Sequence, residues 1–227
     1  MNKNIVIIHY NTPELTYSTI QSIRKVTPGC SFSIFDNSDI KPFKVNDFKG
    51  DITIYDNTKG NFINFEKEIQ KYLLRRKTCN NHASSKHILS IQFMFNLFKE
   101  GFILVDSDVL VKKDISDLFD ESVIWCGMKE QQKSFLKIRL IPYLLWINIP
   151  MCKEYKIRFV KKYQNYKLSH KGIPYYDTGA SFLENCEIAK LKGKEINIYD
   201  YIIHFGGGSY KKKDYKIWLE ENKFLYS

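Results

Sequence analysis

Long apolar runs are missing from this sequence. Its longest mainly apolar stretch spans 140–150, well short of the roughly 20 residues that a membrane-spanning helix requires. The amino-terminal MNKNIVIIHY carries an apolar run too short for the core of a secretory signal. These two absences exclude the usual signals for export and membrane insertion, and we expect a cytoplasmic protein.

Cysteine motifs and linker sequences are equally scarce. The five cysteines are odd in number, widely spaced and form no CxxC pair. That pattern argues against a disulfide framework and a zinc site, and favours a reducing compartment. No stretch rich in proline, glycine and serine divides the 227 residues. A chain of this length can bury one well-formed core, so we expect a single domain.

Positive charge is abundant and uneven. The formal net charge is +10, in a chain with the 44% hydrophobic and 15% aromatic content of a globular protein. Residues 129–171 hold eleven Lys or Arg against two acids, Glu130 and Glu154, and so carry +9 of that charge. Clustered positive charge favours an acidic partner such as nucleotide phosphates, anionic lipid or nucleic acid. A solvated lysine-rich face explains it equally well.

An amphiphilic stretch, IRLIPYLLWINIPMC at 138–152, lies inside this basic segment. Its two prolines make a long regular helix unfavourable. We interpret the stretch as core or flap packing, with contact to a membrane interface or a lipid-linked substrate as the alternative.

Three apolar strands are predicted early in the chain, at 4–9, 32–35 and 52–55, with a helix at 14–25 after the first. Each strand ends in a polar turn, HYNTP, DNSD or DN. In an open parallel sheet, ligands bind outside the carboxyl ends of the strands, so these turns would meet at one crevice. Asn, Asp and Ser are also ordinary turn residues, so any single turn carries little weight.

A pair of carboxylates marks the middle of the chain. Residues 102–105 and 109–111 are short apolar runs typical of buried strands, with Asp106, Ser107 and Asp108 between them. Two carboxylates there would be costly to bury without compensation. At a spacing of two residues, their side chains would share one face of a strand. Because carboxylate oxygens are ligands for divalent cations, the pair is a candidate metal site.

Two helices precede this motif. The apolar spacing predicts them over 61–77 and 85–99. At the start of the second helix, backbone N–H groups and Lys86 could hold a phosphate. Alternatively, Ser84 or Ser85 is an ordinary N-cap and Lys86 is solvated.

Two late clusters add candidate site residues. Asp177, Thr178 and Gly179 precede a predicted helix at 180–192, and Asp177 is either its N-cap or a carboxylate held at the crevice. A further apolar strand ends in His204, followed by GGGS and three lysines. Glycines let a ligand approach the backbone, and a histidine beside lysines suits a metal-bound diphosphate. GGGS alone could equally be a flexible loop.

Taken in order, these motifs resemble those of a known family. A strand with HYNTPELTYSTIQSI, then FDNSD, FILVDSDV, YYDTG, and HFGGGS with lysines is similar to nucleotide-sugar-dependent glycosyltransferases of the GT-A fold, of the kind that builds bacterial surface polysaccharides. The resemblance covers about the whole chain. It implies an α/β fold with a mixed, mainly parallel, Rossmann-like sheet flanked by helices in one domain. A nucleotide-binding half would span 1–111 and an acceptor half 112–227.

The resemblance also implies roles for individual residues. Asp106, Asp108 and His204 would hold Mn²⁺ or Mg²⁺, with Asp106 also near the ribose. Lys86, Ser209 and Lys211 are candidates for the diphosphate. The complete set expected to bind the nucleotide sugar, with UDP as its carrier, is His9, Tyr10, Asn11, Thr12, Asp36, Asn37, Lys86, Asp106, Ser107, Gly207, Ser209 and Lys211.

Asp177 is the expected general base, taking the proton of the acceptor hydroxyl if the reaction inverts the anomeric centre. The late His-Gly motif is more typical of retaining relatives. Polyprenyl-type relatives with the same opening often carry a Glu-Asp pair on the acceptor side, and this chain lacks it. Inversion is therefore preferred only narrowly. The acceptor would be a glycan or a lipid-linked glycan. Segment 129–171 would then hold the enzyme on anionic lipid at the inner face of the membrane.

Two other functions compete with this one. A non-catalytic basic protein could bind nucleic acid or acidic glycan, but its lysines would not account for Asp106, Asp108 and His204. A sugar nucleotidyltransferase would need a glycine- and basic-rich loop after the first strand, where this chain has HYNTPELTY. We therefore expect a metal-dependent hexosyltransferase of surface polysaccharide synthesis.

Overall fold

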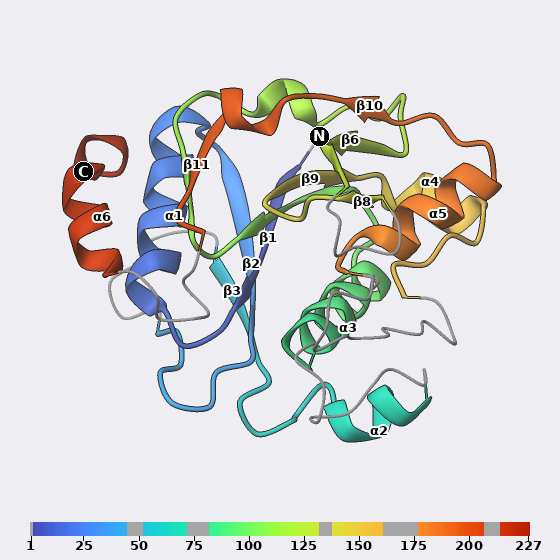
Figure 1. Cartoon of the computed structure of the whole chain (residues 1–227), viewed down its shortest axis with the longest axis horizontal. Coiled ribbons are helices and arrows are strands. Elements are labelled where there is room, and N and C mark those ends of the chain that lie inside the picture. Colours follow the sequence, from blue (N-terminus) through green and yellow to red (C-terminus); the bar gives the residue numbers. More distant parts are fainter. Residues whose placement is uncertain (1, 45–51, 72–81, 132–137, 161–176, 207–213) are drawn as a thin grey trace.

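A computed structural model describes residues 2–44, 52–71, 82–131, 138–160, 177–206 and 214–227 (Figure 1). Its centre is a seven-stranded sheet. In spatial order the strands are β10 (Lys194–Glu195), β6 (Trp125–Gly127), β9 (Leu144–Ile147), β4 (Phe102–Asp106), β1 (Lys3–His9), β2 (Cys30–Asp36) and β3 (Ile52–Asp56).

The sheet is mixed and mainly parallel, as expected. Strands β4, β1, β2 and β3 run parallel to one another, whereas β9 runs antiparallel to both β4 and β6. Two small antiparallel sheets flank it, β5 (Val109–Val111) with β11 (Ile202–His204), and β7 (Lys129–Glu130) with β8 (Arg139–Leu140). Both halves of the sequence therefore contribute strands to the main sheet.

Helices cover both faces of the sheet (Figure 1). They are α1 (Pro13–Val26), α2 (Phe65–Lys71), α3 (His82–Leu97), α4 (Ile149–Glu154), α5 (Ala180–Ile188) and α6 (Tyr215–Glu221), and short 3-10 turns lie at Ser116–Leu118, Ile198–Asp200 and Lys223–Leu225.

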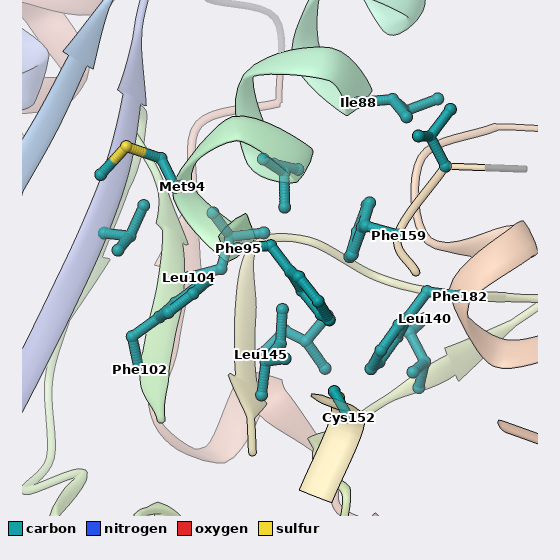
Figure 2. Packing of buried hydrophobic residues seen from close by; sticks show 14 of the residues in the cluster. Ile88, Met94, Phe95, Phe102, Leu104, Leu140, Leu145, Cys152, Phe159 and Phe182 are labelled. Carbon is teal, nitrogen blue, oxygen red and sulfur yellow. The ribbon is translucent and has the colours of Figure 1, made fainter. Parts of the chain in front are cut away.

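The alternating side chains of β1 explain why a hydrophobic core lies on each face of the sheet. Ile5 and Ile7 belong to the core that contains Ile20 and Ile23 of α1, whereas Val6 and Ile8 belong to the core that contains residues of α3. Successive side chains of a strand point to opposite faces, so a fully apolar strand must be covered on both sides. Figure 2 shows the α3 side, where Met94 and Phe95 pack near Leu104.

The helix predicted over 85–99 is present but begins at His82. Ser84 and Ser85 therefore lie within the helix, and the prediction that either is its N-cap is wrong. The helix predicted over 61–77 begins at Phe65, and its part beyond residue 71 lies outside the described residues.

The amphiphilic stretch 138–152 is core, as the preferred interpretation held. It forms β8, β9 and most of α4, and Leu140, Ile141, Leu144 and Leu145 are all fully buried. These apolar side chains are therefore not available to a membrane interface. No helix in the described ranges has both the length and the apolar character needed to cross a bilayer.

Cysteines pair nowhere within the described ranges. Cys30, Cys126, Cys152 and Cys186 are free and buried, and burial raises the pKa of Cys30 and of Cys126 to about 11. Thiols that stay protonated inside a core behave as small apolar groups. Cys79 lies outside the described residues.

Candidate active site

The polar ends of four parallel strands meet at one edge of the sheet, as the strand-end turns predicted. His9 of β1 is in register with Asp36 of β2, which is in register with Asp56 of β3. On the other side of β1, Ile8 is in register with Asp106 of β4. This edge is the carboxyl end of the parallel strands, where open α/β sheets bind ligands.

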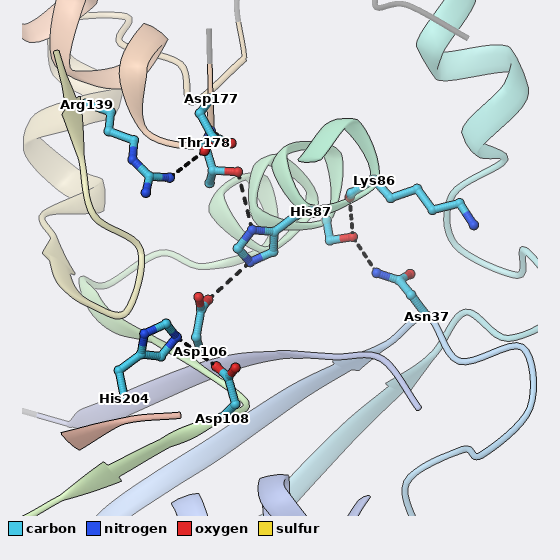
Figure 3. A network of polar contacts seen from close by, with 10 residues as sticks. Asn37, Lys86, His87, Asp106, Asp108, Arg139, Asp177, Thr178 and His204 are labelled. Atoms are coloured by element: carbon cyan, nitrogen blue, oxygen red, sulfur yellow. Dashed lines mark hydrogen bonds and ion pairs between the residues drawn. The ribbon is translucent and has the colours of Figure 1, made fainter. Parts of the chain in front are cut away.

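Asp106, Asp108 and His204 come together at this edge (Figure 3). The chain leaves β4 at Asp106, turns through Ser107 and Asp108, and continues as β5, which pairs with β11 so that His204 lies opposite Val109. His204 Nε2 lies 3.2 Å from Asp108 Oδ1. One ligand atom from each of the three residues can be chosen so that all lie within 4.8 Å of one another. The pairing of β11 with β5 thus joins residues nearly one hundred positions apart in the sequence.

This cluster fits a divalent cation. Two carboxylate oxygens and one imidazole nitrogen are ligands of the kind that Mn²⁺ accepts, and Mg²⁺ also binds carboxylate oxygens. The Asp106 and Asp108 side chains keep 18% and 16% of their surfaces exposed, so an ion and its remaining ligands can reach them. In the described part of the chain, no backbone N–H donates to either carboxylate, so their oxygens are available to a ligand.

Burial raises the pKa of Asp106 above its ordinary value, against the lowering effect of His87, while neighbouring Asp108 raises it further. Two like charges in a partly desolvated place are costly unless a cation lies between them. The electrostatics of the pair thus support the cation site indicated by the geometry.

Tyr143 covers His204 from the side of β9. The two rings stack with centroids 3.7 Å apart and planes inclined by 24°. The carbonyl of Tyr143 accepts a hydrogen bond from the backbone N–H of Asp106, 3.4 Å away. Burial raises the pKa of Tyr143 to about 12, so its hydroxyl stays neutral. Tyr143 therefore restricts the ring of His204 and contacts Asp106 through its backbone.

A buried ion-pair triad lies beside the cluster. Arg139 of β8 is 6% exposed and donates from Nη1 to Asp177 Oδ2 at 2.7 Å and from Nη2 to Glu130 Oε2 at 2.7 Å. Burial alone would lower the pKa of Arg139, but Asp177 and Glu130 outweigh it and raise that pKa. Two carboxylates around one guanidinium compensate its burial. Sequence reasoning missed Arg139 and Glu130 because no motif distinguishes them from other charges in 129–171.

Asp177 is not a helix cap. The N-cap of α5 is Gly179, at φ 88°, and Asp177 Oδ1 instead accepts the N–H of Thr178 at 2.7 Å. A Cβ on Gly179 would lie 2.1 Å from the carbonyl oxygen of Leu140, so only glycine permits this close approach to β8. Arg139 and Gly179 together hold the Asp177–Gly179 turn against β8, near the cluster (Figure 3).

His87 of α3 is a second residue that sequence reasoning did not select. Its Nε2 lies 3.4 Å from Asp106 Oδ1, and its Nδ1 lies 3.4 Å from Thr178 Oγ1. It thus stands between the carboxylate pair and the Asp177–Gly179 turn (Figure 3). Its spacing from other histidines carried no signal, because its partners are carboxylate and hydroxyl groups from distant segments.

Two of the residues expected at the nucleotide, His9 and Asp36, already have hydrogen-bond partners within the protein. His9 is fully buried, with Nδ1 2.7 Å from Thr16 Oγ1 and Nε2 3.3 Å from the carbonyl of Lys41. Asp36 is 1% exposed, and its carboxylate accepts the N–H groups of Ser38 at 2.8 Å and Phe43 at 2.7 Å. These side chains shape the loops after β1 and β2.

The first turn has a more open part. Asn11 adopts φ 57° and its Oδ1 accepts the N–H groups of Ile40 and Lys41 at 3.0 and 2.9 Å. Tyr10 is 40% exposed, with its hydroxyl on Asp39 at 2.9 Å. The hydroxyl of Thr12 donates to the carbonyl of Tyr10 at 3.4 Å. The ring of Tyr10 is therefore open to a ligand.

The remaining expected residues lie in different surroundings. Asn37 donates to Ser90 Oγ at 2.7 Å, and the carbonyl of Ser107 accepts the hydroxyl of Thr19 at 3.1 Å. Lys86 is half-buried, with its Nζ 5.5 Å above the centre of the Phe65 ring. Three of the expected residues, Gly207, Ser209 and Lys211, lie outside the described residues.

Comparison with solved structures identifies proteins with a similar fold. No protein-family model matches the sequence, and no curated protein matches it. Among solved structures, the galactosyltransferase LgtC in complex with donor and acceptor sugar analogs is similar over 86% of this chain and 73% of its own, at 13% identity and a TM-score of 0.56. An active-site mutant of LgtC matches at 12% identity, with the same coverage and a TM-score of 0.51.

The bifunctional glycosyltransferase WbbM is similar over 87% of this chain and 39% of its own, at 9% identity and a TM-score of 0.50. Identities this low show a shared fold. The mixed, mainly parallel sheet flanked by helices is thus the GT-A fold of these glycosyltransferases.

Proposed function

We propose that this protein transfers a sugar from a nucleotide diphosphate sugar, with UDP as the carrier, to a glycan or lipid-linked glycan acceptor. The observation that carries the proposal is the meeting of Asp106, Asp108 and His204 at the carboxyl ends of parallel strands in a GT-A fold. The sugar analogs in the LgtC structure support it, because that protein shares the fold.

Asp106, Asp108 and His204 would hold Mn²⁺ or Mg²⁺. Such a cation, when bound, stabilises the negative charge that develops on a departing diphosphate. The protein's own residues bind and orient the donor. The loops after β1 and β2 would hold the base and ribose, with the exposed ring of Tyr10 as the open surface. Lys86, at the start of the second turn of α3, would add positive charge for the diphosphate.

Asp177 is proposed on the acceptor side. In an inverting reaction it would take the proton of the attacking hydroxyl. Its carboxylate is held by Arg139 and by the Thr178 N–H, which fixes its direction. To act as a base it must exchange part of that pairing for the new proton. Nuclear magnetic resonance of the anomeric proton in the first-formed product would decide between inversion and retention.

Attachment to anionic lipid through 129–171 is proposed on charge alone, since the apolar stretch of that segment is buried. Co-sedimentation with anionic vesicles at low and high salt tests it, and binding that ignores both lipid charge and salt would remove it.

The central experiment is calorimetric titration of UDP with and without Mn²⁺ into the wild type and Asp108→Ala. We expect binding that requires Mn²⁺ and weakens by more than roughly 100-fold in the variant, the scale of losing a direct ligand rather than an outer one. Asp56→Ala is the matched control, since Asp56 also ends a strand of this sheet but its carboxylate accepts hydrogen bonds from Thr58. It should bind as the wild type does.

GDP and CDP are titrated in the same way. If none of the three nucleotides binds with Mn²⁺, the proposed function is wrong. Salt-sensitive binding of a single-stranded nucleic acid without any divalent cation would then favour the binding-protein alternative.

A further inference from the structure

His87 is placed to connect the two sides of the site. It lies on α3, and its ring reaches Asp106 at the end of β4 and Thr178 in the turn before α5. These partners are 19 and 91 positions away in the sequence. Arg139 also pairs with Asp177 of that turn, but it acts on Asp106 through its charge. The ring is also largely enclosed, with 20% of the side chain exposed.

The hydrogen-bonding capacity of the three groups determines their roles. A carboxylate can only accept, so Nε2 of His87 must carry a proton to bond Asp106. The Thr178 hydroxyl can donate or accept, so it can form a hydrogen bond with Nδ1 whether or not that nitrogen carries a proton. In the structure Nε2 is buried at 3.4 Å from Asp106 without a completed hydrogen bond among the described residues. A small shift of the carboxylate would complete it.

We propose that His87 is a positioning residue, which orients the Asp106 carboxylate for the cation through Nε2–H and ties the Asp177–Gly179 turn to it through Thr178. This inference rests on the cation site of the proposed function. Groups that hold a ligand's second oxygen fix its direction, and their loss typically weakens metal binding by roughly 10- to 100-fold.

The link has a consequence for the acceptor side. Thr178 is covalently next to Asp177, whose carboxylate is held by Arg139. A cation that draws Asp106 into its coordination shell would therefore also act on the turn through His87. Cation binding and the placing of Asp177 become coupled, without any change in the charge of His87.

Mn²⁺ affinity, measured by electron paramagnetic resonance titration without nucleotide, tests the first contact. His87→Ala should bind Mn²⁺ roughly 10- to 100-fold more weakly. His87→Gln, whose amide can donate from a similar place, should recover most of that loss. It also keeps the test valid if the alanine variant folds poorly.

Thr178→Val removes the second contact while keeping the shape of the side chain, and should cost about threefold in Mn²⁺ affinity, the scale of one neutral hydrogen bond. Thr178→Ser should bind as the wild type does. Ser90→Ala is the control, because it removes a buried hydroxyl one turn further along α3 that contacts Asn37 rather than Asp106. Equal losses in Ser90→Ala and His87→Ala would assign the effect to helix packing and overturn the proposal.

Nitrogen chemical shifts of the His87 ring in the metal-free protein give a readout that needs no cation. We expect a proton on Nε2, and a proton on Nδ1 alone would overturn the proposal. If the wild type binds no Mn²⁺, the cation site itself fails, whereas wild-type affinity in His87→Ala refutes only the role of His87. The two failures are thus distinguishable.

Discussion

Two groups of polar residues lie at the same edge of the sheet and differ in how many hydrogen-bond partners their side chains have within the protein. After β1 and β2, His9 and Asp36 are buried, and both ring nitrogens and both carboxylate oxygens have protein partners. At β4 and β5, Asp106 and Asp108 face each other with one histidine contact each. Nearly identical sequence patterns, a strand followed by Asp and Ser or Asn, thus produce opposite arrangements.

The difference distinguishes a turn from a ligand site. A buried carboxylate that accepts backbone N–H bonds lowers the free energy of its own loop and has no remaining need for a ligand. Two carboxylates placed together without such donors raise the free energy of the metal-free protein, and a cation relieves that cost. The first group should therefore support stability, and the second should support binding.

The largest effect expected from this comparison is in Asp36→Ala. Removing the carboxylate leaves the N–H groups of Ser38 and Phe43 buried without their acceptor. We expect the free energy of unfolding to fall by about 3 kcal/mol, since bonds to a charged acceptor contribute about 1.5–3 kcal/mol each. Urea denaturation measures it. Mn²⁺ affinity without nucleotide should not change. If Asp36→Ala kept its stability and lost Mn²⁺ affinity, Asp36 would support binding rather than stability, contrary to the comparison.

A smaller effect concerns His9 and pH. Burial lowers its pKa below 6.5, against the raising effects of Asp36 and Glu14, so the unfolded chain takes up this proton first. Stability should therefore decrease as the pH falls below 6.5, by at most about 1.4 kcal/mol per pH unit for one proton. Urea denaturation of the wild type and His9→Gln between pH 5 and 7.5 tests this, in steps of roughly half a unit. Parallel curves for the two proteins would show that His9 does not contribute.

The smallest effect expected is a gain in stability from a lost site residue. The raised pKa of Asp106 means that the folded chain keeps a proton that the unfolded chain releases near 3.8, so stability decreases as the pH rises through that interval. With EDTA present at pH 7, the free energy of unfolding of Asp106→Asn should exceed that of the wild type by about 1 kcal/mol. This is an ordinary size for the effect of one substitution.

Asp56→Asn is the control of opposite sign. Hydrogen bonds from Thr58 lower the pKa of Asp56, so its contribution is present above pH 3.8 and is lost as the pH falls through the lowered value. This variant should lose stability at neutral pH. A loss in Asp106→Asn as well would mean that the metal-free carboxylate pair is stabilising, contrary to the comparison.

Much of the fold followed from local patterns. The strands at 4–9, 32–35, 52–55 and 102–105 and the helix at 14–25 were predicted within a few residues of their observed bounds. Continuous apolar runs bounded by turn residues have few other ways to be buried. The order of motifs also indicated the GT-A fold. The start of α3 was predicted wrongly because Ser84 and Ser85 resemble caps, whereas the helix continues back to His82.

The candidate site was likewise predicted from the sequence only in part. The sequence by itself determined that a buried strand leads directly into Asp106 and Asp108, because their spacing and the apolar residues around them are local facts. Only the tertiary structure decided which polar side chains are hydrogen-bonded within loops and which remain available to a ligand. His87, Arg139 and Glu130 joined the site through contacts between distant segments, and burial and charge compensation at such contacts depend on the packing of helices and sheet rather than on local sequence.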